Sequence, residues 1–215
     1  MSLATKTYVN NHLDSTKKES IFSTLFNGTN GYEIALKDKK MLNVESNRSF
    51  TYGEIAYDGF KAVLELLDRS DEVEFMDFGS GIGKALVCAS MTLTCKRLIG
   101  IEKLPTLASV SKELLNQYND DLKESYPDIE IPSILISEES FDSISLNNVD
   151  VLFVSGTCFS DDVIDSIASR THELKVGANI ISFTRQLSSN HLECIYKGSH
   201  KMEWGLPTVF IYKRK

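Results

Sequence analysis

The sequence predicts a doubly wound α/β fold with a mostly parallel seven-stranded sheet and an antiparallel hairpin at its C-terminal end. Three observations support this fold class. Short apolar segments alternate with helical segments from residue 56 onward, a glycine-rich loop follows the first strand, and two strand-like segments close the chain. Strands that alternate with helices form parallel sheets with helices on both faces.

The first four predicted elements occupy residues 56–102. Segment 56–67 has apolar side chains at helical spacing, which predicts an amphipathic helix. Segment 73–79 is a short apolar run that ends in glycine, which predicts a buried strand. Segment 84–93 predicts a helix, and segment 97–102 predicts a strand that ends in an acid.

The alternation then continues with a long helix and two more strands. Segment 104–125 predicts the helix, and Pro105 lies near its first turn, where proline is favoured. Segments 131–137 and 149–155 are short apolar runs that predict the third and fourth strands.

The last part of the chain adds one more helix and then changes character. Segment 160–174 predicts a helix, because Ser160 can cap it and two acids follow in its first turn. Segment 178–184 predicts the fifth strand. Segments 191–198 and 207–215 both have the pattern of strands, so we expect a hairpin at an antiparallel edge of the sheet.

Residues 1–48 form a polar segment rich in lysine and asparagine. It carries turn signals at 27–31 (NGTNG) and one amphipathic piece at 17–26 that predicts a helix. We interpret it as a helical N-terminal extension, with residues 49–215 forming the main domain. Two roles stay open for the extension: packing against the main domain, or acting as a lid or substrate wall.

The charge of the chain restricts its partners. The net charge is −7, made up of +2 in residues 1–48 and −9 in residues 49–215. Phosphate binding needs clustered lysine and arginine, so strong direct binding of nucleic acid is not expected. An acidic body attracts basic partners instead, such as a lysine-rich protein tail.

Hydropathy and cysteine spacing restrict the compartment. No apolar run approaches the roughly 20 residues that a membrane span needs, and the N-terminus lacks the apolar core of a signal peptide. We therefore expect a protein that is not secreted and has no membrane span. The four cysteines form no CxxC pair and no zinc-like spacing with histidine, which predicts reduced thiols in the cytoplasm or nucleus and no metal site.

The loop DFGSGIGK at 77–84 predicts a nucleotide-type cofactor. Its glycines let the backbone turn tightly and approach a ligand closely. Glu102 ends the second strand, 19 residues after Gly83, which is the usual place for a carboxylate that holds a ribose. A solvated glutamate after a glycine-rich turn is the alternative.

Two residues of this loop distinguish between cofactors. A dinucleotide fingerprint has a third glycine where this chain has Lys84. Asp77 would repel a diphosphate, but it suits the ammonium group of S-adenosyl-L-methionine (SAM). Together with the terminal hairpin, this order favours the Rossmann-like fold of class I SAM-dependent methyltransferases over an NAD enzyme.

Several motifs then resemble one family within that fold. They are TYGEI (51–55), DFGSGIGKA, GIEKLP (100–105), FVSGTCF (153–159), KVGANIISF and the ending MEWGLPTVFIYKRK. From about residue 48 to the end, the chain resembles the Dot1-like protein lysine methyltransferases, particularly their short members from single-celled eukaryotes. The YGE element is the most specific of these motifs. The resemblance implies transfer of a methyl group from SAM to a protein lysine, typically on a histone.

The resemblance also implies which residues contact the cofactor. They are Tyr52, Gly53, Glu54, Asp77, Gly79, Gly81, Glu102, Phe141 and Ser155. The YGE loop would cover the methionine end, and the glycine-rich loop would line the amino-acid part. Glu102 would hold the ribose and Phe141 would stack on the adenine. Ser140 stands where the family has an acid before this phenylalanine.

Most of these residues have a plain structural alternative as well. Phe141 could belong to the core, Tyr52 could be a packing residue, and Glu54 could be a helix N-terminal acid that favours the helix dipole. Trp204, in the predicted hairpin, is a second candidate wall of the site or a packing residue.

The segment FVSGTCF follows the fourth strand, where α/β enzymes place their chemistry. Methyl transfer from a sulfonium needs positioning, a dry channel and a neutral amine, and it needs no nucleophilic cysteine. Cys158 is therefore interpreted as a small packing residue. The resemblance assigns catalytic roles to Ser155, Tyr52 and the channel residue Phe159, with Ser155 standing where the family has asparagine.

Three functions remain open from the sequence. The first is a SAM-dependent methyltransferase acting on a lysine of a histone or another basic protein. The second, motivated by Ser155, is a SAM-binding protein with weak or no activity. The third is a small-molecule methyltransferase on the same fold.

Overall fold

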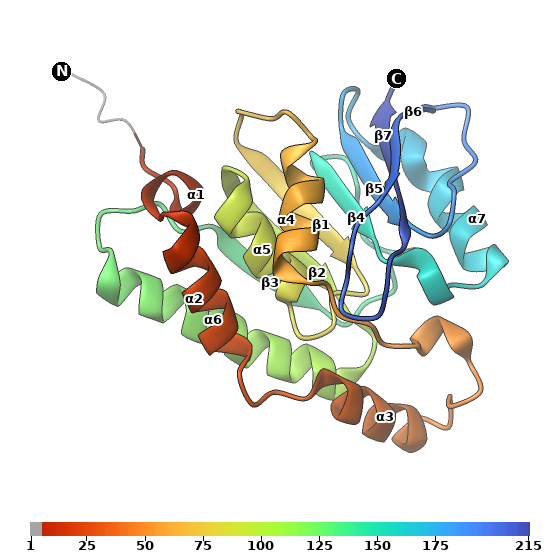
Figure 1. The fold of residues 1–215 in the computed structure, drawn as a ribbon. Helices are drawn as coiled ribbons and strands as arrows, with labels where there is room; N and C mark the ends of the chain where they lie inside the picture. The colour runs from red at the N-terminus through yellow and green to blue at the C-terminus, as the bar shows by residue number, and fades with distance from the viewer. Residues whose placement is uncertain (1–5) are drawn as a thin grey trace.

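The computed structural model describes residues 6–215 and contains one seven-stranded sheet with helices on both faces (Figure 1). The strands are β1 Val73–Phe78, β2 Cys95–Ile101, β3 Ser133–Ser137, β4 Val151–Val154, β5 Asn179–Phe183, β6 Leu192–Ser199 and β7 Thr208–Arg214. The α-helices are α1 Val9–His12, α2 Ser15–Phe26, α3 Gly31–Met41, α4 Tyr57–Glu65, α5 Lys84–Thr92, α6 Pro105–Ser125 and α7 Asp161–Arg170. Short 3-10 turns occur at Arg48–Phe50, Gly156–Cys158 and Thr171–Glu173.

The strand order is β3-β2-β1-β4-β5-β7-β6. The first five strands pair in parallel, and β7 pairs antiparallel with both β5 and β6. The predicted doubly wound sheet with an antiparallel C-terminal hairpin is therefore confirmed. From β1 the chain first adds strands toward one edge of the sheet (β2, β3) and then toward the other edge (β4, β5). Sheets of this kind bind ligands at the carboxyl ends of the two strands where the direction changes, here β1 and β4.

Two apolar clusters hold the layers together. One lies on the sheet face covered by α4, α5 and α6, and it includes Phe60, Leu86 and Leu107. The other lies on the opposite face beneath α7, and it includes Leu152 and Ile164. All side chains of β1, β4 and β5 are buried, as expected for central parallel strands covered on both faces.

The N-terminal segment contains more structure than the sequence indicated. The amphipathic piece forms α2 as predicted, and Asp14 caps it by accepting a hydrogen bond from the Lys17 N–H. The helix α3 was not predicted, because the turn signal NGTNG runs directly into its first residue, Gly31. Phe22 of α2 and Ala35 of α3 belong to the same apolar cluster as Val73 and Phe75 of β1. The roles of lid or substrate wall stay predictions.

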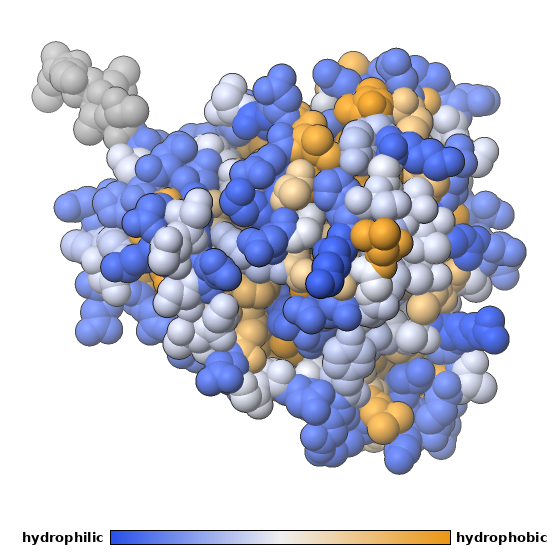
Figure 2. Space-filling model, viewed as in Figure 1, coloured by the Kyte–Doolittle hydropathy of each residue, from blue (hydrophilic) through white to orange (hydrophobic). Residues whose placement is uncertain are grey.

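The surface is largely polar on the face drawn in Figure 2, where hydrophobic residues occur as small separate patches. Within residues 6–215, no helix is both long and apolar enough to cross a membrane. Over the same range, no group of three or more histidine, cysteine or acidic side chains is arranged to hold a metal ion. All four cysteines are free thiols.

Candidate functional site

Two adjoining cavities lie at the carboxyl ends of β1, β2 and β4. The large cavity has a volume of about 270 Å³ and the small cavity about 30 Å³. Four residues line both of them: Tyr52, Gly53, Gly79 and Ser155. Every residue to which the sequence analysis gave a cofactor-binding or catalytic role lines at least one cavity. Glu102, Phe141 and Phe159 line the large cavity, whereas Glu54, Asp77 and Gly81 line the small one.

The glycine-rich loop forms the floor between the cavities. It leaves β1 at Phe78 and enters α5, whose N-cap residue Gly83 has φ of +91°. Gly81 has φ of +54°, and a Cβ atom there would lie 2.6 Å from the Tyr52 ring. Only glycine combines this conformation with so close an approach, so the loop and the Tyr52 ring fit together.

Asp77 is the most unusual group of the small cavity. It lies in β1 between its partners Gly100 and Phe153, and only 2% of it is exposed. Its Oδ1 atom has no hydrogen-bond partner among residues 6–215. Burial, and then the nearby Glu102, raise the pKa of its carboxyl well above 3.8. A buried carboxyl with a free oxygen fits a ligand that brings a positive hydrogen-bond donor.

Glu102 follows β2 and lies at the wall of the large cavity. Its two oxygens accept backbone hydrogen bonds from Gly81 at 2.9 Å and from Leu104 at 2.8 Å. Burial raises the pKa of this carboxyl, and the backbone N–H groups oppose that shift. These two bonds fix the carboxylate at the strand end, and each oxygen keeps a lone pair for a further donor.

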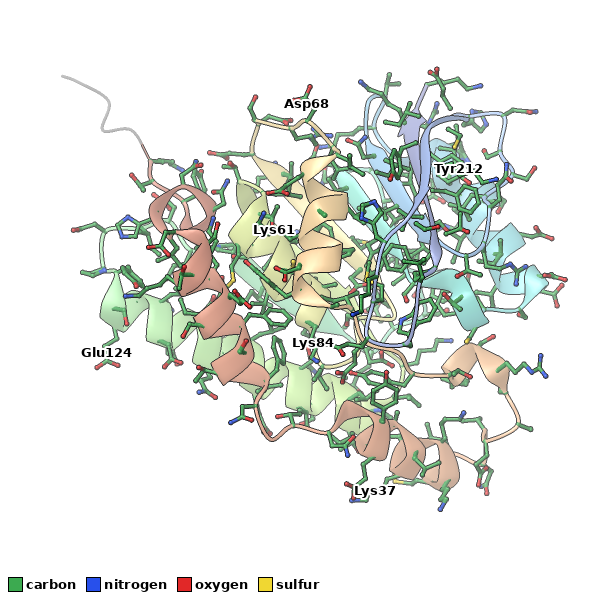
Figure 3. The ribbon with its side chains drawn as sticks, in the orientation of Figure 1. Lys37, Lys61, Asp68, Lys84, Glu124 and Tyr212 are labelled. Atoms are coloured by element: carbon green, nitrogen blue, oxygen red, sulfur yellow. The ribbon has the colours of Figure 1, made fainter. Side chains whose placement is uncertain are left out.

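The segment TYGEI covers the small cavity and is held by polar side chains. The Tyr52 hydroxyl donates to Glu54 Oε1 at 2.9 Å, and Glu54 Oε2 pairs with Lys84 Nζ at 2.5 Å. Lys84, at the start of α5, lies where this segment meets the helix (Figure 3). Burial and Glu54 raise the pKa of the Tyr52 hydroxyl, so it stays protonated and acts as a donor.

Lys84 and its ion pair were not predicted. The sequence analysis used Lys84 only as the residue that replaces a third glycine. Glu54 lies 30 residues earlier, and nothing in the local pattern of either residue indicates the other. The ion pair depends on the packing of the loop before α4 against the N-terminus of α5.

Three aromatic rings form a row beside the large cavity, which Phe141 and Phe159 line. The Phe141 ring lies 5.2 Å from the Phe78 ring and 6.1 Å from the Phe159 ring, measured between centroids. The Arg170 guanidinium donates to the Phe141 carbonyl and holds this turn in place. Phe141 is half-buried, so part of its ring remains open to the cavity.

The segment after β4 turns sharply at Ser155, which has φ of −75° and ψ of +58°. Ser155 is half-buried and borders both cavities. Phe159 faces the glycine-rich loop, since a Cβ atom on Gly79 would lie 3.6 Å from its ring. Cys158 is half-buried and lines neither cavity.

Trp204 lies at the edge of the site rather than inside it. A Cβ atom on Gly53 would lie 3.1 Å from the Trp204 ring, so the indole packs on the backbone of the TYGEI segment. Trp204 is 37% exposed and lines neither cavity. The sequence did not indicate several other residues of the large cavity wall, namely Asn47, Ser49, Leu104, Leu107 and Val163.

Comparisons with known proteins agree with this geometry. A family model described as "Histone methylation protein DOT1" matches residues 32–202. An H3 lysine-79 specific histone-lysine N-methyltransferase of Candida glabrata is 23% identical over 86% of this chain and 29% of its own length. The Drosophila melanogaster enzyme of the same name is 26% identical over 70% of this chain and 8% of its own length. The chain thus spans less than a third of these two relatives.

Solved structures share the fold. Magnesium protoporphyrin IX methyltransferase from Synechocystis, solved with bound SAM, matches with a TM-score of 0.55 and 12% identity. The match covers 96% of this chain and all of that one. The arrangement of seven strands and flanking helices is therefore that of class I SAM-dependent methyltransferases.

Proposed function

Because this chain belongs to the family of the histone methylation protein DOT1, we propose that it transfers a methyl group from SAM to a lysine side chain of a protein. The single observation that carries the cofactor assignment is how three side chains are divided between the two cavities. Asp77 lines the small cavity, and Glu102 and Phe141 line the large cavity that adjoins it. SAM presents its groups with the same division, with the ammonium group at its amino-acid end and the ribose and adenine in its nucleoside part.

Each of these side chains fits one part of the proposed cofactor. The free Oδ1 atom of Asp77 would accept from the ammonium group, and Glu102 would accept from the ribose hydroxyls. The open part of the Phe141 ring would lie against the adenine. Bound SAM supplies an electrophilic methyl group, and the protein would position the amine and exclude water.

The protein would act mainly through positioning and exclusion of water. The TYGEI segment covers the small cavity, and Tyr52 and Glu54 hold it closed against Lys84. Ser155 and Phe159 would border the path of the incoming amine. An apolar path favours the neutral form of a lysine, because desolvation disfavours the ammonium. In-line displacement then needs the amine held in line with the methyl group.

We propose a histone as the substrate, and the nucleus as the compartment where the protein meets it. The relatives in Candida glabrata and Drosophila are named as H3 lysine-79 specific enzymes. The net charge of −9 on residues 49–215 favours association with a basic protein.

Two measurements test the proposal. Calorimetry with SAM and with its product S-adenosylhomocysteine (SAH) should show binding, and radiolabelled SAM should label histone H3 in nucleosomes, in free core histones or in a nuclear lysate. Asp77→Ala should abolish the labelling. Absence of SAM binding at high micromolar concentration would overturn the assignment.

The second candidate is a SAM-binding protein with little or no activity. Ser155 favours it, because a short hydroxyl borders both cavities where the family that the sequence resembles has an asparagine amide. Tight SAH binding without labelling of any lysate protein would support this alternative. Labelling that depends on Asp77 would reject it.

A further inference from the structure

The helix α3 contacts residues that line each of the two cavities, although it lies outside the residues that the sequence assigned to the site. In Figure 1 it lies beside the first turn of α6, below the loop that leads into α4. Its first residue, Gly31, meets the segment that covers the small cavity. Asp38, two turns later, accepts a hydrogen bond from Thr106 in the first turn of α6. The neighbouring residues Leu104 and Leu107 line the large cavity.

At the small cavity, the contact is one of close packing. A Cβ atom on Gly31 would overlap the Tyr52 hydroxyl and would lie 2.6 Å from Glu54 Oε1. The Tyr32 ring adds an edge-on contact with the Tyr52 ring, 5.1 Å between centroids. The start of α3 therefore sets how deeply the TYGEI segment sits over the cavity.

At the large cavity, the contact is a set of hydrogen bonds to one buried carboxylate. Asp38 is 1% exposed. Its Oδ2 atom accepts from the Thr106 N–H at 2.8 Å and the Leu107 N–H at 3.2 Å, and Oδ1 accepts from the Thr106 hydroxyl at 2.5 Å. The first N–H groups of a helix have no intrahelical partner, so Asp38 supplies a cap to α6 from another helix.

The capped turn leads directly to Glu102. Leu104 immediately precedes α6, and its N–H donates to Glu102 Oε1 at 2.8 Å. Leu104 and Leu107 also line the large cavity. Three links thus connect α3 to the proposed ribose carboxylate: Asp38 to the first turn of α6, that turn to Leu104, and Leu104 to Glu102.

We propose that Asp38 is a positioning residue for the cofactor, acting through Glu102, and that α3 is a structural part of the cofactor site. This inference rests on the proposed SAM site and adds a residue that no motif of the site contains. Without the Asp38 carboxylate, the first turn of α6 loses its cap, and the Glu102 carboxylate loses the fixed position in which it meets the ribose. Cofactor affinity then falls although every direct contact residue is present.

Calorimetric titration of the full chain with SAH tests this. We expect Asp38→Ala to weaken SAH binding at least tenfold. Asp38→Asn should show a smaller loss, because its amide oxygen still accepts a hydrogen bond but carries no charge. In a Glu102→Gln background, Asp38→Ala should change the SAH affinity less than twofold, since the group through which it acts has been altered.

The matched control is Asp150→Ala. Asp150 is also a buried carboxylate that accepts a backbone hydrogen bond, from Glu74 at 2.9 Å, but it lies before β4, at the opposite end of the sheet. The Asp150→Ala substitution should lower the melting temperature and leave the SAH affinity within twofold of wild type. If Asp38→Ala does not fold, Asp38→Asn carries the same test in both backgrounds.

Two results would overturn the inference. One is SAH affinity within twofold of wild type in the folded Asp38 variants. The other is an equal loss of SAH affinity in the wild-type and Glu102→Gln backgrounds, which would mean that Asp38 does not act through Glu102. If the wild-type chain itself does not bind SAH, the proposed function is overturned as well. If the wild-type chain binds SAH and the Asp38 variants bind it equally well, only this inference is overturned.

Discussion

Replacing Asp77 with asparagine separates the stability of the protein from its affinity for the proposed cofactor. Asp77 is buried beneath the small cavity, and its Oδ1 atom has no partner among the described residues. Asparagine has nearly the same shape and carries no charge. We therefore expect Asp77→Asn to make the ligand-free protein more stable and to make SAH binding weaker.

The magnitudes follow from the burial of the group. Asparagine leaves a neutral polar group in the same place but removes the charge, and burying an unpaired charge costs more than burying a neutral polar group; we take the difference to be on the order of 2 kcal/mol. In a domain of this size, 1 kcal/mol shifts the melting temperature by about 2–4 °C, which predicts a rise of roughly 4–8 °C. A hydrogen bond to a charged group is worth about 1.5–3 kcal/mol, so SAH affinity should fall roughly 10- to 100-fold.

The gain in stability should depend on pH in a defined direction. Burial raises the pKa of Asp77 in the folded state above 3.8, so the folded protein holds this proton where the unfolded chain has lost it. The stability of wild type therefore falls as pH rises from about 4 through the folded-state pKa. The difference between Asp77→Asn and wild type should be small at pH 4 and should reach a plateau above that pKa.

Differential scanning fluorimetry from pH 4 to 8 measures the stability, and calorimetry measures the affinity. The second ligand is 5′-methylthioadenosine, which lacks the amino-acid part of SAH and should bind Asp77→Asn and wild type equally. A lower melting temperature in Asp77→Asn, or an equal loss of affinity for both ligands, would refute the reasoning and make Asp77 a structural residue.

Three further substitutions address the rest of the cleft. Ser155→Asn should keep SAH affinity within about threefold and raise histone labelling tenfold or more, because a well-placed amide donor contributes mainly in the transition state; unchanged labelling would contradict this. Cys158→Ser should keep labelling within about twofold, because Cys158 lines neither cavity; loss of labelling would restore it as a catalytic candidate. Phe141→Ala should weaken SAH and 5′-methylthioadenosine alike, by about 2- to 10-fold, as expected for an aromatic contact worth about 0.5–1.5 kcal/mol, and an effect confined to SAH would place Phe141 away from the adenine.

The sheet was predictable because its signals are local. Central strands such as β4 are continuous apolar runs, and the amphipathic pattern of α4 is visible in twelve consecutive residues. The glycines at 79, 81 and 83 also follow a local rule, since positive φ angles favour glycine wherever they occur. Both kinds of signal are present in the sequence itself, before any tertiary contact forms.

The site was predictable where a strand end determines the position of a side chain. Asp77, Glu102 and Ser155 lie at or just after the carboxyl ends of β1, β2 and β4, which parallel pairing brings to one edge of the sheet. Contacts between distant segments gave no such signal. The pair of Glu54 and Lys84 depends on how a loop packs against a helix, and neither residue lies in a periodic pattern that indicates the other.

The helix α3 shows why a helix near a site can escape sequence analysis. Its buried face consists of Gly31, Ala35 and Asp38, so it has no apolar stripe to produce a helical period. Asn30 caps it by accepting from the Glu33 N–H at 3.1 Å, and the same asparagine–glycine pair is a common turn signal. Small and polar residues are buried here because the helix must approach Tyr52 closely and must also present a carboxylate to α6. The features that would connect α3 to the cofactor are therefore the features that remove its hydrophobic pattern.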